Sequence, residues 1–141
     1  MQINIDSSRV VTAAAQLQTY KESKITALSA ACRAAIKDGF ESEVLGELHR
    51  YPSNETDQLN LASSLADSLL PGLAANWSTP FWCANQAGDW AMRMHTTEQI
   101  QQLGREAKAR IVSLMQRNAL LAEQVQQANS KAEVDQFEWS A

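Results

Sequence analysis

The chain has 141 residues, of which 45% are hydrophobic and 20% are charged, and its formal net charge at pH 7 is −4. These values are ordinary for a soluble globular protein and exclude wholesale disorder. The acidic balance shows no electrostatic footprint for nucleic acid, so we expect no nucleic-acid partner. We expect no signal peptide, because residues 1–20 lack a basic start followed by an apolar run. We expect no membrane contact, because no apolar stretch approaches about 18 residues.

The first predicted element is a long helix. Residues 10–37 contain no glycine or proline and are rich in alanine, which favours a helix, and Gly39 follows as a C-terminal cap. Before the helix, Ile3 and Ile5 alternate with polar residues, which predicts a short strand or an arm. We interpret residues 1–37 as an arm and a long helix used for attachment or oligomerisation.

The next predicted elements are a short extended segment and a second helix. Residues 40–51 carry few helix signals, and in a strand His49 and Tyr51 would share one face. Residues 55–70 return to a helical period, with acidic side chains in the first turn.

A β-hairpin is predicted at residues 80–95, because Asn-Gln-Ala-Gly between two apolar runs is turn chemistry, with Gly88 at a positive φ. In the second arm, large apolar side chains alternate with Ala91, Arg93 and His95. We expect the apolar side of this arm to pack against the helices and the side with Arg93 and His95 to face away from them. The apolar side consists of Trp90, Met92 and Met94.

The last long element is a helix beginning at Thr96 or Thr97, where Thr96 and Gln99 have capping-box spacing. Its apolar residues recur at steps of three and four, which is typical of a coiled-coil seam. This seam packs either against the first helix alone or also against another chain, and Asn118 within it would fix register or oligomeric state. The seam residues are Ile100, Leu103, Ala107, Ile111, Leu114, Asn118, Leu121 and Val125.

Together these elements predict an α+β fold that is mainly α. Two long antiparallel helices would carry a short helix and a small antiparallel β-sheet inserted between them. Residues 38–141 would hold the sheet, the short helix and the long C-terminal helix, and would join residues 1–37 in one compact domain.

The residues able to carry chemistry gather around the two histidines. If their strands pair, these side chains form a metal site, a hydrogen-bonded polar network or a partner-binding face. No close ligand spacing is present, so we predict no metal and no cofactor. The candidate residues are His49, Tyr51, Asp57, Gln58, Asn60, Arg93 and His95.

The aromatic cluster and the two cysteines leave further alternatives. Trp77, Phe81, Trp82 and Trp90 either anchor the sheet as core or form an exposed patch for a protein or sugar ligand. Cys83 together with a histidine is one route to nucleophilic catalysis, but a thiol in an apolar arm is usually inert.

Three stretches, GFESEVLGELHRYPSNETDQLNL, PFWCANQAGDWAMRMHTTEQIQQLGREAKARI and the closing FEW, resemble a phage and prophage family of unknown function. Its members are commonly encoded in tail modules, near tail-fibre genes. The resemblance covers about residues 38–139. The recurring positions are Gly39-Phe40, Leu45-Gly46, His49, Tyr51, Asp57-Gln58, Asn60-Leu61, Phe81-Trp82-Cys83, Trp90, Arg93, His95-Thr96, Gln99-Ile100 and Trp139.

The resemblance implies a non-enzymatic protein that acts by contact with other phage tail proteins, in the tail fibre or baseplate. It would be either a structural virion component or a tail-fibre assembly factor, found in the host cytoplasm during assembly or in the virion tail. A homo-oligomer is a further alternative. The rival hypothesis is a small metal- or Cys-dependent hydrolase centred on His49, Asp57, Cys83 and His95.

Overall fold

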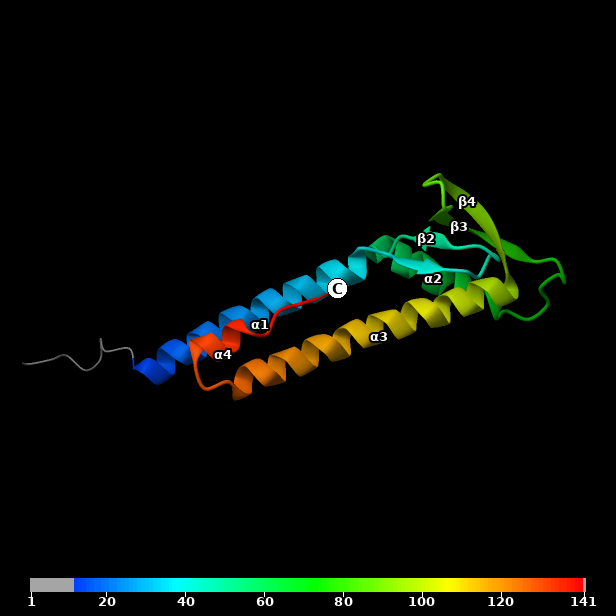
Figure 1. Cartoon of the computed structure of the whole chain (residues 1–141). Coiled ribbons are helices and arrows are strands. Elements are labelled where there is room, and N and C mark those ends of the chain that lie inside the picture. The colour runs from blue at the N-terminus through cyan, green and yellow to red at the C-terminus, as the bar shows by residue number, and fades with distance from the viewer. Residues whose placement is uncertain (1–11, 141) are drawn as a thin grey trace, which may run out of the picture. The chain divides into compact units, whose positions relative to one another are not determined.

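The computed structural model describes residues 12–140, so the arm predicted at residues 1–9 lies outside the described residues. The fold is α+β and mainly α, as predicted (Figure 1). The elements in chain order are α1 (Ala13–Lys37), β1 (Phe40–Ser42), β2 (His49–Tyr51), α2 (Glu55–Ser68), β3 (Ser78–Ala84), β4 (Trp90–Thr96), α3 (Thr97–Gln127) and α4 (Lys131–Asp135).

The chain divides into two compact units. One holds the described residues 12–31 and 117–140, and the other holds residues 32–116. The division therefore falls inside α1 and α3. None of the helices in residues 12–140 combines the length and apolar content that a membrane crossing requires.

The element ends follow local sequence signals. The Thr96 hydroxyl accepts from the Gln99 backbone N–H at 3.2 Å, and the Gln99 side chain accepts from the Thr96 N–H at 2.9 Å, which confirms the predicted capping box. Gly39 ends α1 with a φ of +93°, and Gly88 turns the hairpin with a φ of +84°.

Within the unit of residues 32–116, α1 and α3 run antiparallel, as predicted. The Cys32 Sγ lies 3.5 Å from the Leu114 carbonyl oxygen, and Arg110 Nη2 donates to the Ala35 carbonyl oxygen at 3.0 Å. A later residue of α1 therefore meets an earlier residue of α3.

The same unit contains a four-stranded antiparallel sheet in the order β1-β2-β3-β4. Phe40 of β1 pairs with Tyr51 of β2, and β3 pairs with β4 along its whole length. The pairing of Arg50 with Ala84 joins β2 to β3. Among the described strands, β4 has β3 as its only neighbour and is therefore an edge strand.

One face of the sheet, with α2 and α3, encloses the core of this unit. The Phe40 and Tyr51 rings stack with centroids 5.6 Å apart, and the Tyr51 and Phe81 centroids are 6.1 Å apart. Burying each large side chain contributes about 1.5–3 kcal/mol, so this cluster holds the sheet to the helices. The other buried members are Leu61, Cys83, Ile100, Leu103 and Ala107.

The side of the hairpin that carries Arg93 and His95 faces this core, although the sequence predicted that this side would face away from it. Phe81, Cys83 and His95 are all buried. The register pairs Phe81 with Arg93, so a period of two places Arg93 and His95 on the covered side of the sheet. The prediction that the tryptophan and methionine side of β4 packs against the helices is therefore wrong.

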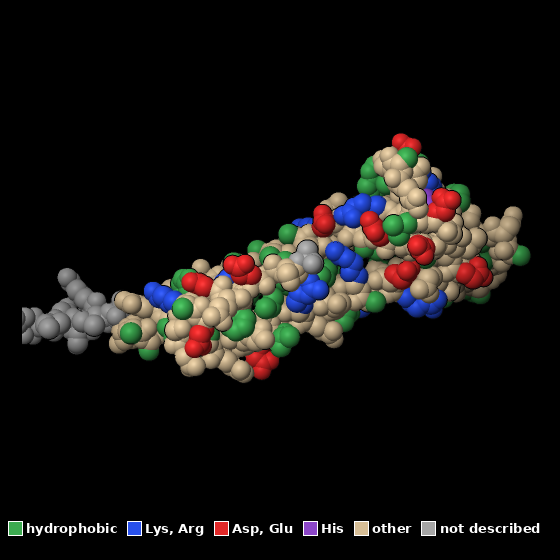
Figure 2. Space-filling model, in the orientation of Figure 1, with side chains coloured by type: hydrophobic (Ala, Val, Ile, Leu, Met, Phe, Trp, Pro, Cys, Tyr) green, Lys and Arg blue, Asp and Glu red, His purple; other side chains and the backbone are tan. Residues whose placement is uncertain are grey.

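The opposite side of the hairpin is open to solvent, and we call it the hairpin face. Its members Trp82, Trp90, Met92 and Met94 have exposed fractions of 43%, 43%, 55% and 56%. Figure 2 shows hydrophobic side chains at the surface over this part of the molecule. These large apolar side chains are exposed to water because the opposite side of β3 and β4 packs against the core.

The second unit is built from helical segments of α1, α3 and α4. Its apolar core contains Leu28 of α1, Val125 of α3 and Val134 of α4. Lys21 is buried nearby, and its Nζ donates to the Gln126 carbonyl oxygen at 2.7 Å. Carbonyls in the last turn of a helix lack intrahelical partners and favour a cation, which explains a lysine inside the apolar pattern.

The C-terminal segment packs within this second unit. The Tyr20 hydroxyl donates to the Asp135 carboxylate, and α4 follows a Ser130 cap. The Arg117 guanidinium lies 5.4 Å from the centroid of the Trp139 ring and donates to the Ser140 carbonyl oxygen.

Gly39→Ala is expected to destabilise the protein more than Gly46→Ala. Both glycines have a φ near +94°, but a Cβ on Gly39 would lie 2.5 Å from the Tyr51 carbonyl oxygen, while a Cβ on Gly46 meets nothing within 4 Å. Gly46→Ala should cost about 1–2 kcal/mol from its conformation, and Gly39→Ala about 1–3 kcal/mol more from the clash. Urea unfolding measures both, and equal costs would contradict this account of the α1–β2 approach.

Candidate functional site

The covered side of the sheet contains a buried pair, Tyr51 and His95. His95 Nδ1 lies 2.8 Å from the Arg93 carbonyl oxygen, which can only accept, so Nδ1 carries the proton. In the neutral imidazole, Nε2 then accepts from the Tyr51 hydroxyl, 2.8 Å away. The pair joins β2 to β4, and both imidazole nitrogens and the Tyr51 hydroxyl have a hydrogen-bond partner.

Burial keeps both partners neutral near pH 7. Burial lowers the pKa of His95, and nearby His49 acts in the same direction, while the Arg93 carbonyl partly opposes them. Burial also raises the pKa of the Tyr51 hydroxyl, with Cys83 and the Glu106 carboxyl acting in the same direction. The pair is thus a neutral hydrogen bond in an apolar surround.

Arg93 is half-buried and is satisfied by backbone carbonyls. Its guanidinium donates to the carbonyl oxygen of Cys83 on β3, and Nη2 donates to that of Asp89 at 3.1 Å. Arg93 therefore ties the hairpin tip to its own strands, on the side away from the hairpin face.

Further polar contacts surround His49. Its Nδ1 donates to the Glu47 carbonyl oxygen at 2.9 Å, and Ser42, paired opposite His49 in the sheet, donates its hydroxyl to the Glu106 carboxylate at 2.8 Å. Sequence reasoning missed Ser42 and Glu106. The sequence carried no signal for them, because the register that places Ser42 opposite His49 is seen only in the folded sheet.

The three candidates from α2 do not join the histidines. Asp57 accepts at 3.0 Å from the Asn54 N–H that precedes α2, and Gln58 donates at 2.9 Å to the Ser53 carbonyl oxygen. Asn60 is exposed. The expectation that this helix start reaches His49 and His95 is wrong, because its side chains bond to the adjacent backbone instead.

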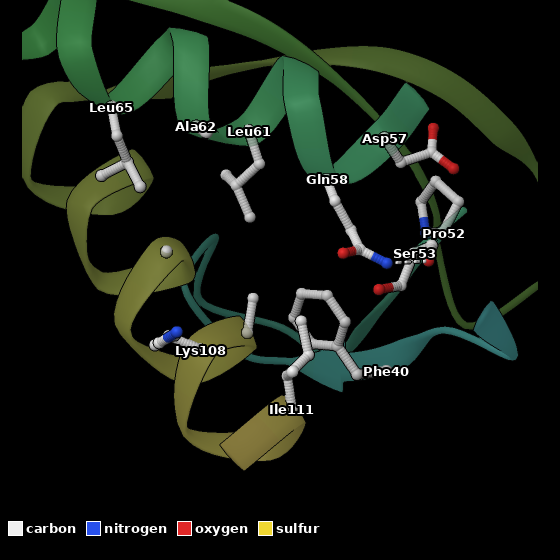
Figure 3. A pocket seen from close by; sticks show the side chains of 12 residues that line it. Phe40, Pro52, Ser53, Asp57, Gln58, Leu61, Ala62, Leu65, Lys108 and Ile111 are labelled. Carbon is white, nitrogen blue, oxygen red and sulfur yellow. Dashed lines mark hydrogen bonds between the residues drawn. The ribbon is translucent and has the colours of Figure 1, made fainter. Parts of the chain in front are cut away.

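A cavity of about 310 Å³ lies between α2, α3 and β1 (Figure 3). Leu61, Leu65, Phe40 and Ile111 make its lining largely apolar, and Lys108 lies at its side. Its volume is at the low end for a small-molecule site. Neither member of the buried Tyr–His pair lines it, so the groups with shifted pKa values do not meet this cavity.

The rival hydrolase constellation is not assembled in this structure. Cys83 and His95 have no exposed surface, and Asp57 caps α2 elsewhere. In residues 12–140 no group of three or more His, Cys, Asp or Glu side chains is placed to hold a metal ion. The hydrolase hypothesis gains no support from this geometry.

The hairpin face is one continuous apolar surface. The Trp82 and Trp90 rings stack at 6.1 Å with an interplanar angle of 19°, and Trp82 pairs across the strands with Met92. Pro80 pairs with Met94 beside them. Of the two interpretations of the aromatic cluster, exposure applies to Trp82 and Trp90, while the remaining two aromatics, Trp77 and Phe81, pack in the core.

The predicted seam of α3 faces the chain's own cores. Within residues 32–116 its buried members are Ile100, Leu103, Ala107 and Leu114, and Ile111 is half-buried. In the second unit Val125 is buried, and Asn118 and Leu121 are half-buried. The Asn118 Oδ1 is buried and has no hydrogen-bond partner among residues 12–140, and its role in register or oligomeric state stays a prediction.

The fold and this region define a small, mainly helical protein whose sheet has a sealed polar core and an open apolar face. A family model described as a domain of unknown function, DUF4376, matches residues 19–139, and the chain belongs to this family. The match begins inside α1, earlier than the resemblance at residues 38–139. Comparison with the curated proteins finds no match, and comparison with the solved structures finds none.

His95→Ala is expected to lower the free energy of unfolding by about 1–3 kcal/mol, because it leaves the Tyr51 hydroxyl and the Arg93 carbonyl without their partner. Chemical denaturation measures the loss. Met94→Ala, on the exposed side of the same strand, is the matched control and should change stability by less than about 0.5 kcal/mol. An unchanged stability of His95→Ala would refute the structural role of the pair.

Stability is also expected to fall as the pH drops below about 6.5, the ordinary pKa of histidine. The pKa of His95 is lowered in the folded state, so below that pH the unfolded chain binds more protons and unfolding is favoured. Urea unfolding at several pH values between about 5 and 7.5 tests this against His95→Gln, which does not titrate there. Identical pH slopes for the two proteins would contradict the prediction.

Proposed function

We propose that this protein acts by protein–protein contact, as a phage tail or tail-fibre-associated protein, and that the hairpin face is its contact surface. The observation that carries the contact role is the open row of Trp82, Trp90, Met92 and Met94. The sequence resemblance to tail-module proteins supports the phage setting.

The composition and size of the hairpin face suit an interface core. Tryptophan and methionine are enriched in interface cores, and tryptophan is enriched among the residues that dominate binding energy. With the exposed fractions given above, these four large side chains present an apolar surface on the order of 400 Å², within the range where a surface patch is often functional. A protein that met only water would gain stability and solubility by placing polar side chains there.

The hairpin face is also held in place before binding. The covered side of the same strands is fixed by Phe81, the Tyr51–His95 hydrogen bond and the contacts of Arg93. A partner therefore spends little free energy on ordering this surface, which favours affinity for a given contact area. The proposed role is accordingly that of a scaffold without catalysis.

Two forms of the role differ in where the protein ends up. A structural component of the tail or baseplate remains in the purified particle at a fixed stoichiometry. An assembly factor acts in the host cytoplasm and is absent from the particle despite good expression. Quantitative mass spectrometry of purified particles separates the two.

The double variant Trp90→Ser/Met92→Ser should lose the tail partner. Tagged protein is produced in cells assembling the phage, and captured tail proteins are quantified by mass spectrometry. We expect at least about a tenfold loss of captured tail protein, because two central apolar anchors are removed.

Met115→Ser is the matched control, since Met115 is 57% exposed on α3, away from the hairpin. It should capture tail protein as the unaltered chain does. Capture of no tail protein by the unaltered chain, together with a strict monomer in sedimentation, would overturn the proposed function. Equal capture by the double variant would remove the hairpin face from it.

A further inference from the structure

The edge of the sheet beside the hairpin face is unprotected. β4 pairs with β3 along Trp90–Thr96 and has no other described strand beside it, so half of its backbone N–H and C=O groups point away from the sheet. Natural proteins block such edges with proline, lysine, bulges or inward-pointing charges. β4 contains no proline and no lysine, and its pairing with β3 is continuous, without a bulge.

The one charge in β4 does not guard this edge. Arg93 points to the covered side, but its guanidinium is already paired with the Cys83 and Asp89 carbonyl oxygens, so it is not an unpaired inward charge that an added strand would bury. The side chains beside the edge on the open side are Trp90, Met92 and Met94, which are uncharged and exposed. The Thr96 N–H at the end of β4 already donates to the Gln99 side chain. An added strand would thus find outward-pointing backbone groups and an apolar row along Trp90–Met94.

Both ends of this edge are acidic. Asp89 precedes β4 and is exposed, and Glu98 follows it by two residues and is exposed as well. No basic side chain of β4 lies on the open side. Charge complementarity therefore favours a strand with apolar residues at alternate positions and a basic residue at each end.

We propose that the hairpin edge binds its partner by strand addition: an extended segment of another protein, apolar at alternate positions and flanked by lysine or arginine, pairs with β4 and lies against the hairpin face. This inference rests on the proposed contact role of that face. Main-chain hydrogen bonds would supply affinity, and the alternate side chains would supply specificity.

The size of the hairpin face favours an added strand over contact with the face alone. The hairpin face alone offers about 400 Å², about half of what each partner buries in a standard stable interface. A strand that uses the edge as well as the face adds backbone contacts without requiring a larger patch. A second copy paired through the same edge is the competing occupant, and the experiment separates it.

The probe is a capped peptide in which seven alternating valine and threonine residues, the length of β4, lie between two terminal lysines. Binding to the full-length protein is measured by isothermal titration and by amide hydrogen exchange. We expect slowed exchange in Trp90–Met94 on binding. The same peptide with alternate backbone nitrogens methylated should bind at least about tenfold more weakly, because it cannot complete the ladder.

Two matched comparisons test the edge and the charge. Met92→Lys should reduce binding at least about tenfold, whereas Met115→Lys, an equally exposed methionine on α3, should leave it unchanged. A peptide with terminal glutamates should bind more weakly than the lysine peptide. Circular dichroism establishes that both lysine variants are folded.

The outcomes are separable. Equal binding of the methylated peptide, or no binding of the unmodified one, overturns strand addition and leaves the contact role of the hairpin face to the capture experiment. A dimer in sedimentation velocity that Met92→Lys dissociates assigns the edge to a second copy and also overturns the proposal. Peptide binding with slowed β4 exchange supports strand addition even if no tail protein is captured.

Discussion

The hydrogen bond between Tyr51 and His95 is the interaction on which the arrangement of the sheet depends. It joins β2 to β4 across β3, inside a core that excludes water. Successive residues of a strand point to opposite sides, so fixing His95 inward also fixes Met94 outward. The apolar surface that we propose for binding is therefore a geometric consequence of a polar contact on its reverse.

A hairpin turned the other way would bury more tryptophan and methionine, and the reason it is not adopted lies in pairing. Phe81 and Cys83 already share one side of β3, and Tyr51 stacks beside them on β2. Turning the hairpin would expose Phe81 and leave the Tyr51 hydroxyl buried without a partner, which is costly in an apolar surround. Consistency across the strands outweighs the hydrophobicity of one strand.

The elements themselves could be predicted because their signals are local. Three elements are specified within a few residues each. Gly39 after a glycine-free run marks a helix end, the Thr96–Gln99 spacing marks a helix start, and Gly88 marks the hairpin turn. The orientation of the hairpin could not be predicted, since both of its sides carry large apolar groups and the choice is made by residues distant in sequence.

The candidate site was predictable to a similar extent. The association of Tyr51 with His95 was predicted from a pairing of their strands, but in the structure β3 lies between β2 and β4 and the two side chains meet across it. The placement of Asp57 depends on competition between the histidines and the nearby Asn54 backbone. A short acidic side chain at the start of a helix most readily accepts a hydrogen bond from the adjacent backbone N–H groups. Ser42 and Glu106 became visible as participants only once the sheet partner of His49 was known.

Lys21 has a consequence for how α1 and the end of α3 can align. Alanine-rich helical surfaces are smooth, and by themselves they tolerate sliding by a turn with little loss of contact. Lys21 removes that freedom, because its ammonium reaches the Gln126 carbonyl oxygen in one alignment only. In any other alignment the positive charge would be buried among hydrocarbon groups without a partner. The lysine therefore selects one alignment of the two helices. It adds little to the free energy of their packing, but it destabilises every other alignment.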